Sequence, residues 1–384
     1  MNYREVTENI SELLHRDGGV PRDHGRDVPT FYKETVPALA ERGLFGLLIP
    51  EEYGGRGLSV LEYVAAMEAI GAYDAMAAYT VNEHSTIGSL PLVTHGDSDQ
   101  KQYWLPRLAE GSVLAAFCLT EPQSGSDVTS LTTTATPSTD GYLLNGKKIH
   151  ISLAHHAKLF TVLAELDGGN GKRRKTAFLV PRDADGLSNG PENSSPPGYL
   201  IPVAGSVVME DVRCQPSDVL GDIGVGGRIF QLALETARIG LPAALVGGGQ
   251  DALTRCLERL TTRKSFGQPL SSHQMVQAKL ADMAVRVKTS RLIVASAAEE
   301  IDRSPADATE ICAMAKVYAT EAMREVGADA VQLFGGAAFL EEPPLDWLMR
   351  DSKMAEILGG TSEIMRLLIA KSLLADVHTA HGAS

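Results

Sequence analysis

The residues of this chain best suited to chemistry lie where glycines and small polar side chains interrupt apolar runs. One such stretch, from Leu358 to Glu363, reads LGGTSE and precedes an apolar run with helical spacing. The first turn of a helix has free N–H groups and a positive dipole end, which together favour an anionic ligand. The stretch therefore indicates a ligand site, although its two glycines offer neither an acid nor a base.

A second stretch, FCLTEPQSGSDV from Phe117 to Val128, joins an apolar strand to a turn rich in Pro, Gly and Ser. Such a turn exposes backbone N–H groups and small hydroxyls, an arrangement that suits polar or anionic ligand atoms. A tight turn with a purely structural role has the same composition, so both interpretations stay open for this stretch alone.

A third stretch, NGKKIHIS from Asn145 to Ser152, begins with the Asn-Gly pair that is typical of a β-hairpin turn. Side chains alternate along a strand, so we expect His150 and Ser152 to share one face. An imidazole and a hydroxyl on one face could meet a planar polar ring. A single histidine is also common as a structural or surface residue.

Two more stretches suggest a nucleotide. Arg263–Gln268 reads RKSFGQ, with Gln274 soon after it, and Gln332–Gly336 reads QLFGG. Arginine binds phosphate with paired hydrogen bonds, Phe266 could support a flat base, and paired glycines let a backbone approach a ligand closely. Each stretch is also typical of an ordinary helix end.

The pattern of apolar residues predicts helices, then strands, then helices. Helical spacing covers residues 36–48 and 60–70, short β-rich runs cover residues 113–118, 141–144, 159–164 and 176–180, and long helical runs cover residues 229–260, 274–301, 306–333 and 345–374. We therefore expect an α+β protein with an N-terminal helical domain (1–115), a middle β-domain (116–220) and a C-terminal helical domain (221–384).

Composition narrows the function classes. The chain has 384 residues, 44% of them hydrophobic, and a net charge of −13, so a basic nucleic-acid-binding face is not expected. No apolar run of about 18 residues predicts a membrane span, and the mixed-charge N-terminus is unlike a signal peptide. The cysteines are dispersed, without metal-site spacing, which predicts reduced thiols, a cytoplasmic location and no metal site. They are Cys118, Cys214, Cys256 and Cys312.

Taken together, these stretches resemble landmarks of the acyl-CoA dehydrogenase family of flavoproteins. The matching segments, in family order, are IPEEYGGRGL, TEPQSGSD, NGKKIHIS, RKSFGQPLSSHQ, DAVQLFGG and LMRDSKMAEILGGTSEI. The resemblance covers nearly the whole chain. It implies an N-terminal helical domain, a middle β-domain, a C-terminal four-helix bundle, FAD between the last two, and assembly as a homodimer or homotetramer.

The resemblance also implies roles for individual residues. The flavin ring and its pyrimidine side would contact Phe117, Leu119, Thr120, Gly125, Ser126, His150, Ile151 and Ser152, with the Ser152 hydroxyl at flavin N5. The pyrophosphate and adenosine would contact Arg263, Phe266, Gln274, Gln332, Gly335 and Gly336 across a subunit interface. Thr361 and Glu363 would hold the diphosphate-ribose region, and Ser126, Arg238 and Gly359 would meet substrate.

The family's usual reaction is α,β-dehydrogenation of an acyl thioester, in which a glutamate removes the α-proton. That glutamate most often precedes the Gly-Thr pair, where this chain has Gly359. A minority of the family places it before the substrate-site arginine, matched here by Arg238, and this chain has Ala237 there. Neither position holds a carboxylate, although the Gly359 N–H could still polarise a thioester carbonyl.

Three explanations of the missing glutamate stay open. In the first, another group is the base. Glu235 is the leading candidate, although it lies about 200° around a helix from Ala237. His150 is a further possibility because it would lie beside the flavin, and Glu356 resembles a non-catalytic family position. In the second, no such base is needed, because the substrate loses carbon dioxide, is an amine that is oxidised, or is a compound that is oxygenated. In the third, the chain is an inactive relative.

These considerations lead to a hierarchy of functions. We expect FAD-dependent oxidation of an acyl or aminoacyl thioester, carried on coenzyme A or a carrier protein, with a non-standard base and in specialised biosynthesis. Electron-transfer flavoprotein or O2 would accept the electrons. A flavin-dependent monooxygenase or N-hydroxylase on the same fold is the alternative, and a non-catalytic flavin- or acyl-binding relative is the third.

Overall fold

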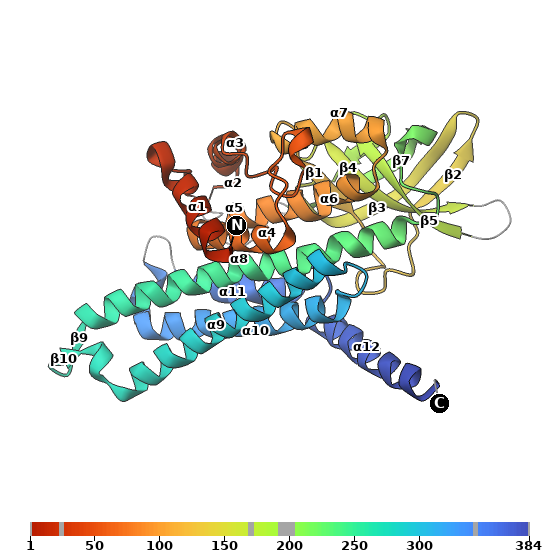
Figure 1. Cartoon of the computed structure of the whole chain (residues 1–384). Helices are drawn as coiled ribbons and strands as arrows, with labels where there is room; N and C mark the ends of the chain where they lie inside the picture. Colours follow the sequence, from red (N-terminus) through yellow and green to blue (C-terminus); the bar gives the residue numbers. More distant parts are fainter. Residues whose placement is uncertain (1, 23–26, 168–172, 191–203, 341–344, 383–384) are drawn as a thin grey trace.

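A computed structural model of the chain arranges its elements in three consecutive blocks, helices first, then a sheet, then long helices (Figure 1). The structure describes residues 2–22, 27–167, 173–190, 204–340 and 345–382. This order matches the expected α+β architecture. The exact domain limits given above stay a prediction.

The first block is made of short helices around a buried one. Its elements are α1 (Tyr3–His15), η1 (Arg16–Gly18), α2 (Val28–Thr30), η2 (Phe31–Thr35), α3 (Val36–Glu41), η3 (Glu51–Tyr53), α4 (Val60–Tyr73), α5 (Ala75–Asn82), η4 (Glu83–Ser89), α6 (Leu90–His95) and α7 (Ser98–Ala109). The helix expected over residues 36–48 is too long, because α3 ends at Glu41 and the chain turns at Gly43 with a φ of +64°. A left-handed glycine is a common helix stop.

The middle block is one eight-stranded sheet. Its strands are β1 (Ala115–Cys118), β2 (Thr134–Ser138), β3 (Gly141–Ser152), β4 (Leu159–Asp167), β5 (Arg173–Pro181), β6 (Leu187–Asn189), β7 (Ala204–Cys214) and β8 (Val219–Leu220), joined in the order β6-β7-β3-β2-β4-β5-β8 with β1 on β4. Phe160 and Val162 of β4 belong to one apolar core, whereas Leu159 and Leu163 belong to another. Because side chains alternate along a strand, β4 is buried on both faces.

The third block consists of long helices. Its elements are α8 (Gly226–Thr262), β9 (Lys264–Ser265), β10 (Gln268–Pro269), η6 (Leu270–Ser272), α9 (Gln274–Arg303), α10 (Thr309–Phe334), η7 (Gly335–Phe339), α11 (Asp346–Ala355) and α12 (Ser362–Gly382). The single helix expected over residues 345–374 is two helices, because Gly359 and Gly360 have φ values of +64° and +104°. The turn between α11 and α12 is therefore built by the two glycines noted in the sequence.

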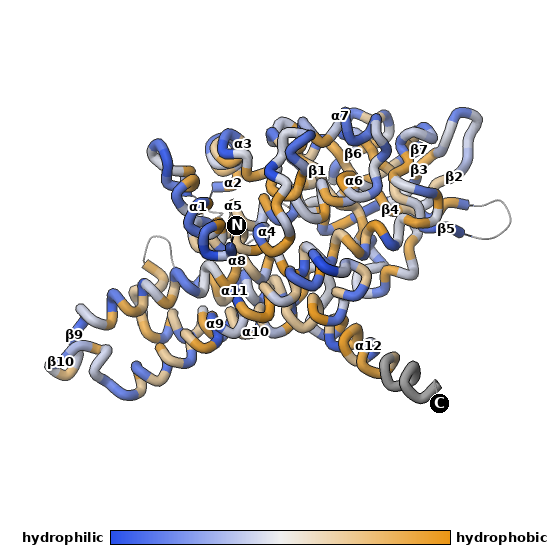
Figure 2. The backbone as a smooth tube through the Cα atoms, in the orientation of Figure 1, coloured by the Kyte–Doolittle hydropathy of each residue, from blue (hydrophilic) through white to orange (hydrophobic). Residues whose placement is uncertain are grey.

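α8 connects the three blocks. A Cβ added to Gly247 would lie 1.9 Å from the Glu68 carbonyl oxygen, and one added to Gly71 would lie 2.1 Å from that of Ala244, so only glycine lets α4 and α8 pack this closely. α8 is long and apolar enough by composition to cross a bilayer, but 72% of its apolar window is buried inside the protein. Figure 2 shows that apolar stretch running through the middle of the molecule.

Candidate active site

The turn that follows β1 is held by a fully buried ion pair. Lys148 of β3 donates to Glu121 Oε1 at 2.8 Å, and neither side chain is exposed. Glu121 also accepts hydrogen bonds from the backbone N–H groups of Thr132 and Thr133. Burial alone would raise the pKa of Glu121, but the hydrogen bonds from Lys148 and the threonines bring it down to about 2. The turn therefore has one fixed shape on the β3 side of the sheet.

The predicted flavin-contacting residues of this turn differ in exposure. Phe117 is buried and stacks on Phe230 of α8 with ring centroids 3.9 Å apart. The Leu119 carbonyl accepts from Lys148 at 3.1 Å, and the Thr120 carbonyl accepts from the Ile149 N–H at 2.9 Å. Beyond the ion pair, residues 125–126 (Gly125 and Ser126) are exposed. The structure thus joins the β1 end to α8 and leaves the Gly-Ser portion open to a ligand.

β3 is irregular where the predicted ring-contacting residues lie. The register between β3 and β7 shifts between Lys148 and Ile151, and His150 has a φ of +54°. His150 is exposed, Ile151 is buried and Ser152 is partly buried. The expectation that His150 and Ser152 share a face stays a prediction, because a register shift and the left-handed backbone at His150 interrupt the strict alternation from which it was drawn. Left-handed backbone at a non-glycine residue is often found at functional sites.

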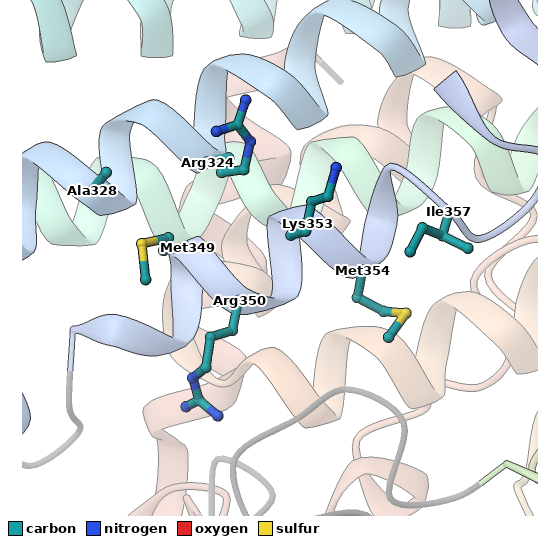
Figure 3. A pocket seen from close by; sticks show the side chains of 7 residues that line it. All are labelled: Arg324, Ala328, Met349, Arg350, Lys353, Met354 and Ile357. Carbon is teal, nitrogen blue, oxygen red and sulfur yellow. The ribbon is translucent and has the colours of Figure 1, made fainter. Parts of the chain in front are cut away.

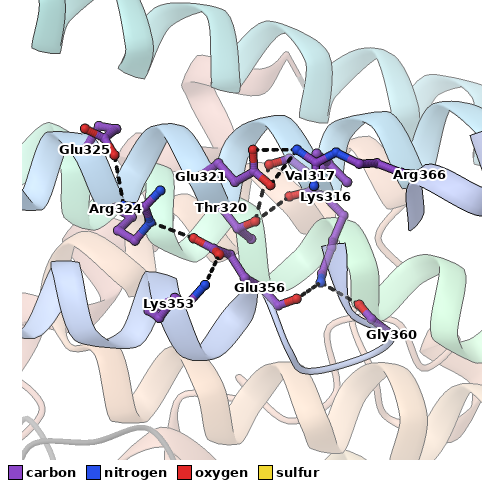
Figure 4. A network of polar contacts seen from close by, with 10 residues as sticks. All are labelled: Lys316, Val317, Thr320, Glu321, Arg324, Glu325, Lys353, Glu356, Gly360 and Arg366. Atoms are coloured by element: carbon purple, nitrogen blue, oxygen red, sulfur yellow. Dashed lines mark hydrogen bonds and ion pairs between the residues drawn. The ribbon is translucent and has the colours of Figure 1, made fainter. Parts of the chain in front are cut away.

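The turn between α11 and α12 is anchored from two helices. Arg238 Nε of α8 donates to the Gly359 carbonyl at 2.8 Å. Lys316 Nζ of α10 donates to the carbonyls of Glu356 at 3.0 Å and Gly360 at 2.6 Å (Figure 4). Burial, and next the Arg238 charge, lowers the pKa of Lys316 to about 7. Within the described part of the chain, the Gly359 N–H donates no hydrogen bond, so it is free to meet a ligand.

Two carboxylates near this turn already have partners. Glu356 accepts from Arg324 at 2.8 Å and from Lys353 at 2.6 Å, as Figure 4 shows. Glu235 is buried on α8, where the Thr309 hydroxyl donates to it and Gln231 donates at 3.2 Å. α8 is continuous through this region, so Glu235 points away from Ala237, as helical geometry predicts. Its assignment as base stays a prediction.

The N-terminus of α12 has the form that the sequence predicted. The Ile364 N–H donates to Thr361 Oγ1 at 3.3 Å, and Glu363 lies exposed in the first turn. Hydrogen bonds from its own backbone N–H and from Thr361 lower the pKa of Glu363. Thr361 and Glu363 therefore both lie at an accessible helix N-terminus, next to the Gly359 turn.

The remaining predicted cofactor residues lie at the other end of α8. Arg263 follows α8, and Phe266 is the tip of the β9–β10 hairpin, 94% exposed with a φ of +51°. Arg259 of α8 lies over the ring of Phe334, the residue before Gly335, so the end of α10 belongs to the same region. The other members, Gln274, Gln332, Gly335 and Gly336, are exposed as well.

This far end cannot serve the same cofactor as the near end of the same chain. From Arg238 to Arg263 are 25 residues, or about 37 Å along the helix at 1.5 Å per residue. The structure therefore brings the predicted residues together as two groups, not one. We call the group around Phe117, Ser152 and Gly359 the near end, and the group around Arg263, Phe266 and Gly335 the far end.

Both groups fit parts of the FAD that the sequence resemblance implies. A Cβ on Gly125, Gly335 or Gly336 would meet nothing within 4 Å, so the backbone there is open to a ligand. The buried Ser362 hydroxyl beside the near-end turn has no partner among the described residues. Arg263 supplies a cation for phosphate, and the exposed Phe266 ring supplies a flat apolar surface. This set suits a dinucleotide with a flat ring at each end.

Sequence reasoning missed one group of residues that reaches Ser152. Tyr79 of α5 shares a 2.5 Å hydrogen bond with the Ser152 hydroxyl, and Glu83 of η4 lies within hydrogen-bonding reach of that same hydroxyl. Asn82 donates to Glu83 Oε1 at 3.3 Å. These residues come from the N-terminal helices, about 70 positions before Ser152, so no local sequence motif links them to the site. A π-helical segment at η4 is the one local sign, since such segments are frequent at functional sites.

A separate pocket of about 440 Å³ lies on the surface of the third block. Figure 3 shows its lining from α10 and α11, which consists of Arg324, Ala328, Met349, Arg350, Lys353, Met354 and Ile357. None of the predicted site residues lines this pocket, and its surface is mostly apolar. It is therefore distinct from the near end.

Comparison with known proteins identifies the relatives of the chain. Family models for the N-terminal, middle and C-terminal domains of acyl-CoA dehydrogenases match residues 5–112, 116–212 and 224–374. A probable acyl-CoA dehydrogenase of Bacillus subtilis (strain 168) is 36% identical, over 96% of this chain and 97% of the relative. The chain spans about half the length of other relatives, such as the mitochondrial very long-chain specific acyl-CoA dehydrogenase of Macaca fascicularis, of which it covers 52%.

Solved structures of the same fold include enzymes with different substrates. Butyryl-CoA dehydrogenase from Megasphaera elsdenii aligns with a TM-score of 0.88 at 31% identity, over 97% of this chain and 99% of that one. The prolyl acyl carrier protein oxidase AnaB aligns with a TM-score of 0.89 at 28% identity, over 97% of this chain and 98% of that one. The expected order of helical, β and helical domains is therefore confirmed.

Proposed function

Because this chain belongs to the acyl-CoA dehydrogenase family, we propose that it uses FAD to oxidise an acyl or aminoacyl thioester by α,β-dehydrogenation, with a non-standard base. The thioester is carried on coenzyme A or on a carrier protein. The presence of both a butyryl-CoA dehydrogenase and a prolyl carrier-protein oxidase among similar structures supports this range of substrates. The missing glutamate favours a specialised biosynthetic role in the cytoplasm.

The main support for this proposal is that α8 contacts both the end of β1 and the Gly359 turn. Phe230 stacks on Phe117, and Arg238, eight residues later, binds the Gly359 carbonyl. Eight residues correspond to about 12 Å of helix, so both turns border the same stretch of α8. That stretch is where a flavin ring and a thioester could meet.

Residues of both groups would hold the cofactor. In the near end, Phe117–Ser126, His150–Ser152, Thr361 and Glu363 would contact the ring and the adjoining ribose and phosphate. In the far end, Arg263, Phe266, Gln274, Gln332, Gly335 and Gly336 would contact the pyrophosphate and adenosine. When bound, FAD supplies a hydride acceptor. The chain itself supplies binding, orientation and proton transfer.

The Gly359 turn would polarise the substrate carbonyl. Arg238 and Lys316 fix the Gly359 and Gly360 carbonyls, which leaves the Gly359 N–H available as a donor. A preorganised N–H that meets a developing enolate oxygen stabilises it without further rearrangement. Gly359 also leaves open the volume that a glutamate side chain would fill, since a Cβ there would meet only Arg238 Cγ at 3.8 Å.

A second copy of the chain would complete the site. The far end lies about 37 Å along α8 from Arg238, so its residues would serve the cofactor of a partner in a homodimer or homotetramer. Exposed apolar side chains on the third block support such an assembly. They include Phe266, Met275, Val285, Leu292, Phe339, Leu340, Leu367, Leu373 and Leu374.

The proposal is tested with purified protein and a panel of thioesters. We expect a flavin absorption spectrum, and anaerobic loss of that absorption when an acyl or aminoacyl thioester on coenzyme A or a carrier protein is added. Turnover in air, or only with electron-transfer flavoprotein, then identifies the electron acceptor. Protein that takes up no FAD, or flavin that no thioester reduces, would overturn the proposal.

The absence of a carboxylate at Gly359 and Ala237 also supports one alternative, a flavin-dependent monooxygenase or N-hydroxylase. In that case the flavin is reduced only by an external NAD(P)H-dependent flavin reductase, and labelled O2 places an oxygen atom in the product. A non-catalytic relative would bind the acyl thioester without either reaction.

A further inference from the structure

The N-terminal helices contribute a carboxylate to the near end. Glu83 is the first residue of η4, its carboxylate accepts a hydrogen bond from the Asn82 side-chain amide at 3.3 Å, and it lies beside the Ser152 hydroxyl. The buried Tyr63 hydroxyl donates to Asn82 Oδ1 at 3.1 Å, and Tyr79 bonds Ser152 at 2.5 Å. The recorded donor to Glu83 is thus the neutral Asn82 amide, and no cation is paired with Glu83 among the described residues.

The same carboxylate lies beside the small-residue face of α8. A Cβ on Gly240 would lie 2.2 Å from Asn82 Oδ1 and 2.9 Å from Tyr63 Cε1, so α8 contacts the residue next to Glu83 at that glycine. Ala237 is three residues earlier, on the same helical face. The position where a minority of the family has its base is therefore small and lies on the side of α8 that approaches Glu83.

We propose that Glu83 is the base that removes the α-proton of the thioester, replacing the glutamate that Gly359 and Ala237 lack. This assignment rests on the proposed function and names the group which that function leaves open. Glu83 comes from the N-terminal block, whereas both usual positions lie in the third block. It is the carboxylate of the described near end that adjoins Ser152.

The proton balance of the step is simple. The Cα–H bond breaks, its proton passes to a Glu83 carboxylate oxygen, and its electron pair forms the Cα=Cβ bond. The Cβ–H bond breaks at the same time, and its hydrogen leaves with both electrons to the bound FAD. The substrate loses two hydrogens, and the carboxylate becomes a carboxylic acid that later releases its proton to solvent.

The protonation of Glu83 suits this task. Burial raises the pKa of Glu83 to about 7, although the hydrogen bonds from Ser152 and Asn82 act in the opposite direction. A general base is most effective when its pKa lies near the working pH. Tyr63 and Tyr79 are the titratable groups around it, and burial first, then the Glu83 charge, raises the pKa of each well above its ordinary value. Both tyrosines therefore stay neutral while Glu83 titrates.

The rival acid has a different environment. Glu235 bonds Thr309 at the start of α10, beside Cys312, and lies about 200° around α8 from Ala237. Glu235→Gln therefore tests the rival base by the same chemical change, at a carboxylate that lies outside the Ser152 network. Glu83→Asp keeps the carboxylate but shortens its reach.

The decisive experiment compares these variants as FAD-loaded protein. Flavin reduction by the best thioester of the panel is followed anaerobically, and exchange of α-hydrogens with D2O is followed by NMR in an arylacetyl thioester that has no β-hydrogen to lose. We expect Glu83→Gln to lower both rates at least about a hundredfold, the usual scale for loss of a general base. Glu235→Gln, which removes the rival base, should lower both rates far less than Glu83→Gln does, and Glu83→Asp should retain part of each rate.

A measurement without cofactor or substrate tests the ionisation itself. Infrared pH-difference spectra of the apoprotein should contain a carboxylic acid band that disappears with a midpoint near pH 7. The band should be missing in Glu83→Gln and present in Glu235→Gln. Thermal unfolding and FAD content show whether each variant is folded.

The outcomes separate the two proposals. If wild-type flavin is reduced by no thioester, the proposed function is wrong and this assignment falls with it. If the wild type reacts but Glu83→Gln keeps both rates within a few fold, Glu83 is not the base and the function stands. Loss of both rates in Glu235→Gln alone would establish the rival that sequence analysis favours.

Discussion

The two ends of α8 differ in how completely one chain builds them. At the near end, Lys148 pairs with Glu121, Arg238 with Gly359, and Tyr79 with Ser152, all within the chain. At the far end, Phe266 is 94% exposed, and a Cβ on Gly335 or Gly336 would meet nothing within 4 Å. The near end is thus preorganised by the fold, whereas the single chain leaves the far end open.

The largest expected loss of stability follows from breaking the buried Lys148–Glu121 pair of the near end. Glu121→Gln leaves the Lys148 charge buried without its anion, and we expect the free energy of unfolding to fall by about 3–5 kcal/mol. Urea unfolding at pH 7 measures this. Glu8→Gln, which removes the exposed partner of Arg4, is the control and should change stability by less than about 0.5 kcal/mol. Equal effects would contradict the preorganisation of the near end.

Glu83, at the near end, should make the free energy of unfolding depend on pH. Its pKa is raised from 4.5 to about 7, so between these values the folded state holds a proton that the unfolded state has released. Its contribution therefore favours folding at low pH and is lost as pH rises to about 7, by at most about 3 kcal/mol. Glu83→Gln should match the wild type at pH 4 and exceed it above pH 7.

Urea unfolding across that pH range checks the sign. Glu363→Gln is the comparison, because Glu363 is exposed and its pKa is lowered, so its contribution changes in the opposite direction. A stability difference between Glu83→Gln and wild type that is constant with pH would show that Glu83 has an ordinary pKa.

A substitution at the far end should weaken FAD binding and leave the stability of the apoprotein almost unchanged. Phe266→Ser removes a ring that is 94% exposed and meets His273 only edge-on, so apoprotein stability should change by less than about 0.5 kcal/mol. If the ring stacks on the adenine, FAD affinity should fall by about 1–3 kcal/mol, which is the scale for aromatic stacking on a base. Fluorescence titration with FAD and the mass of the assembly in solution measure both. Unchanged affinity would remove Phe266 from the cofactor site.

The smallest effect distinguishes two neighbouring glycines. Gly335 has a φ of +64° and a ψ of −147°, a region that is essentially restricted to glycine, whereas Gly336 has no left-handed φ. Both have open space around them. Gly335→Ala should therefore cost about 1–3 kcal/mol in unfolding free energy from backbone strain alone, and Gly336→Ala close to none. Similar losses of unfolding free energy in the two variants would mean that the backbone at Gly335 adjusts to accept alanine.

Much of the fold could be predicted because its signals are local. The strand expected over residues 159–164 is β4 (Leu159–Asp167), and the helix expected over residues 274–301 is α9 (Gln274–Arg303). The errors arose where a turn lies inside an apolar pattern. Gly43 ends α3 early, and Gly359 with Gly360 separates α11 from α12, since apolar periodicity does not reveal a left-handed backbone.

The site could be predicted only in part, because some of its contacts join segments that are far apart in the sequence. The Gly359 turn and the hairpin with Phe266 each have a local motif, whereas the Asn145-Gly146 pair, expected at a hairpin turn, lies inside β3. Glu83 has none: it reaches Ser152 only because α5 and η4 pack against the sheet and α8, and its raised pKa is a consequence of that burial. His150 and Ser152 were expected on one face, and a register shift in β3 interrupts the regular alternation on which that expectation rests.

By itself, the sequence determined the family and the order of helices and strands, because these depend on residue identity and short-range periodicity, and it predicted that Ala237 and Gly359 stand where relatives have their base. Only the tertiary structure decided which acid lies beside Ser152 and that the predicted cofactor residues form two groups. Both depend on contacts between segments far apart in the chain, fixed by close approach at residues such as Gly240 and by the length of α8.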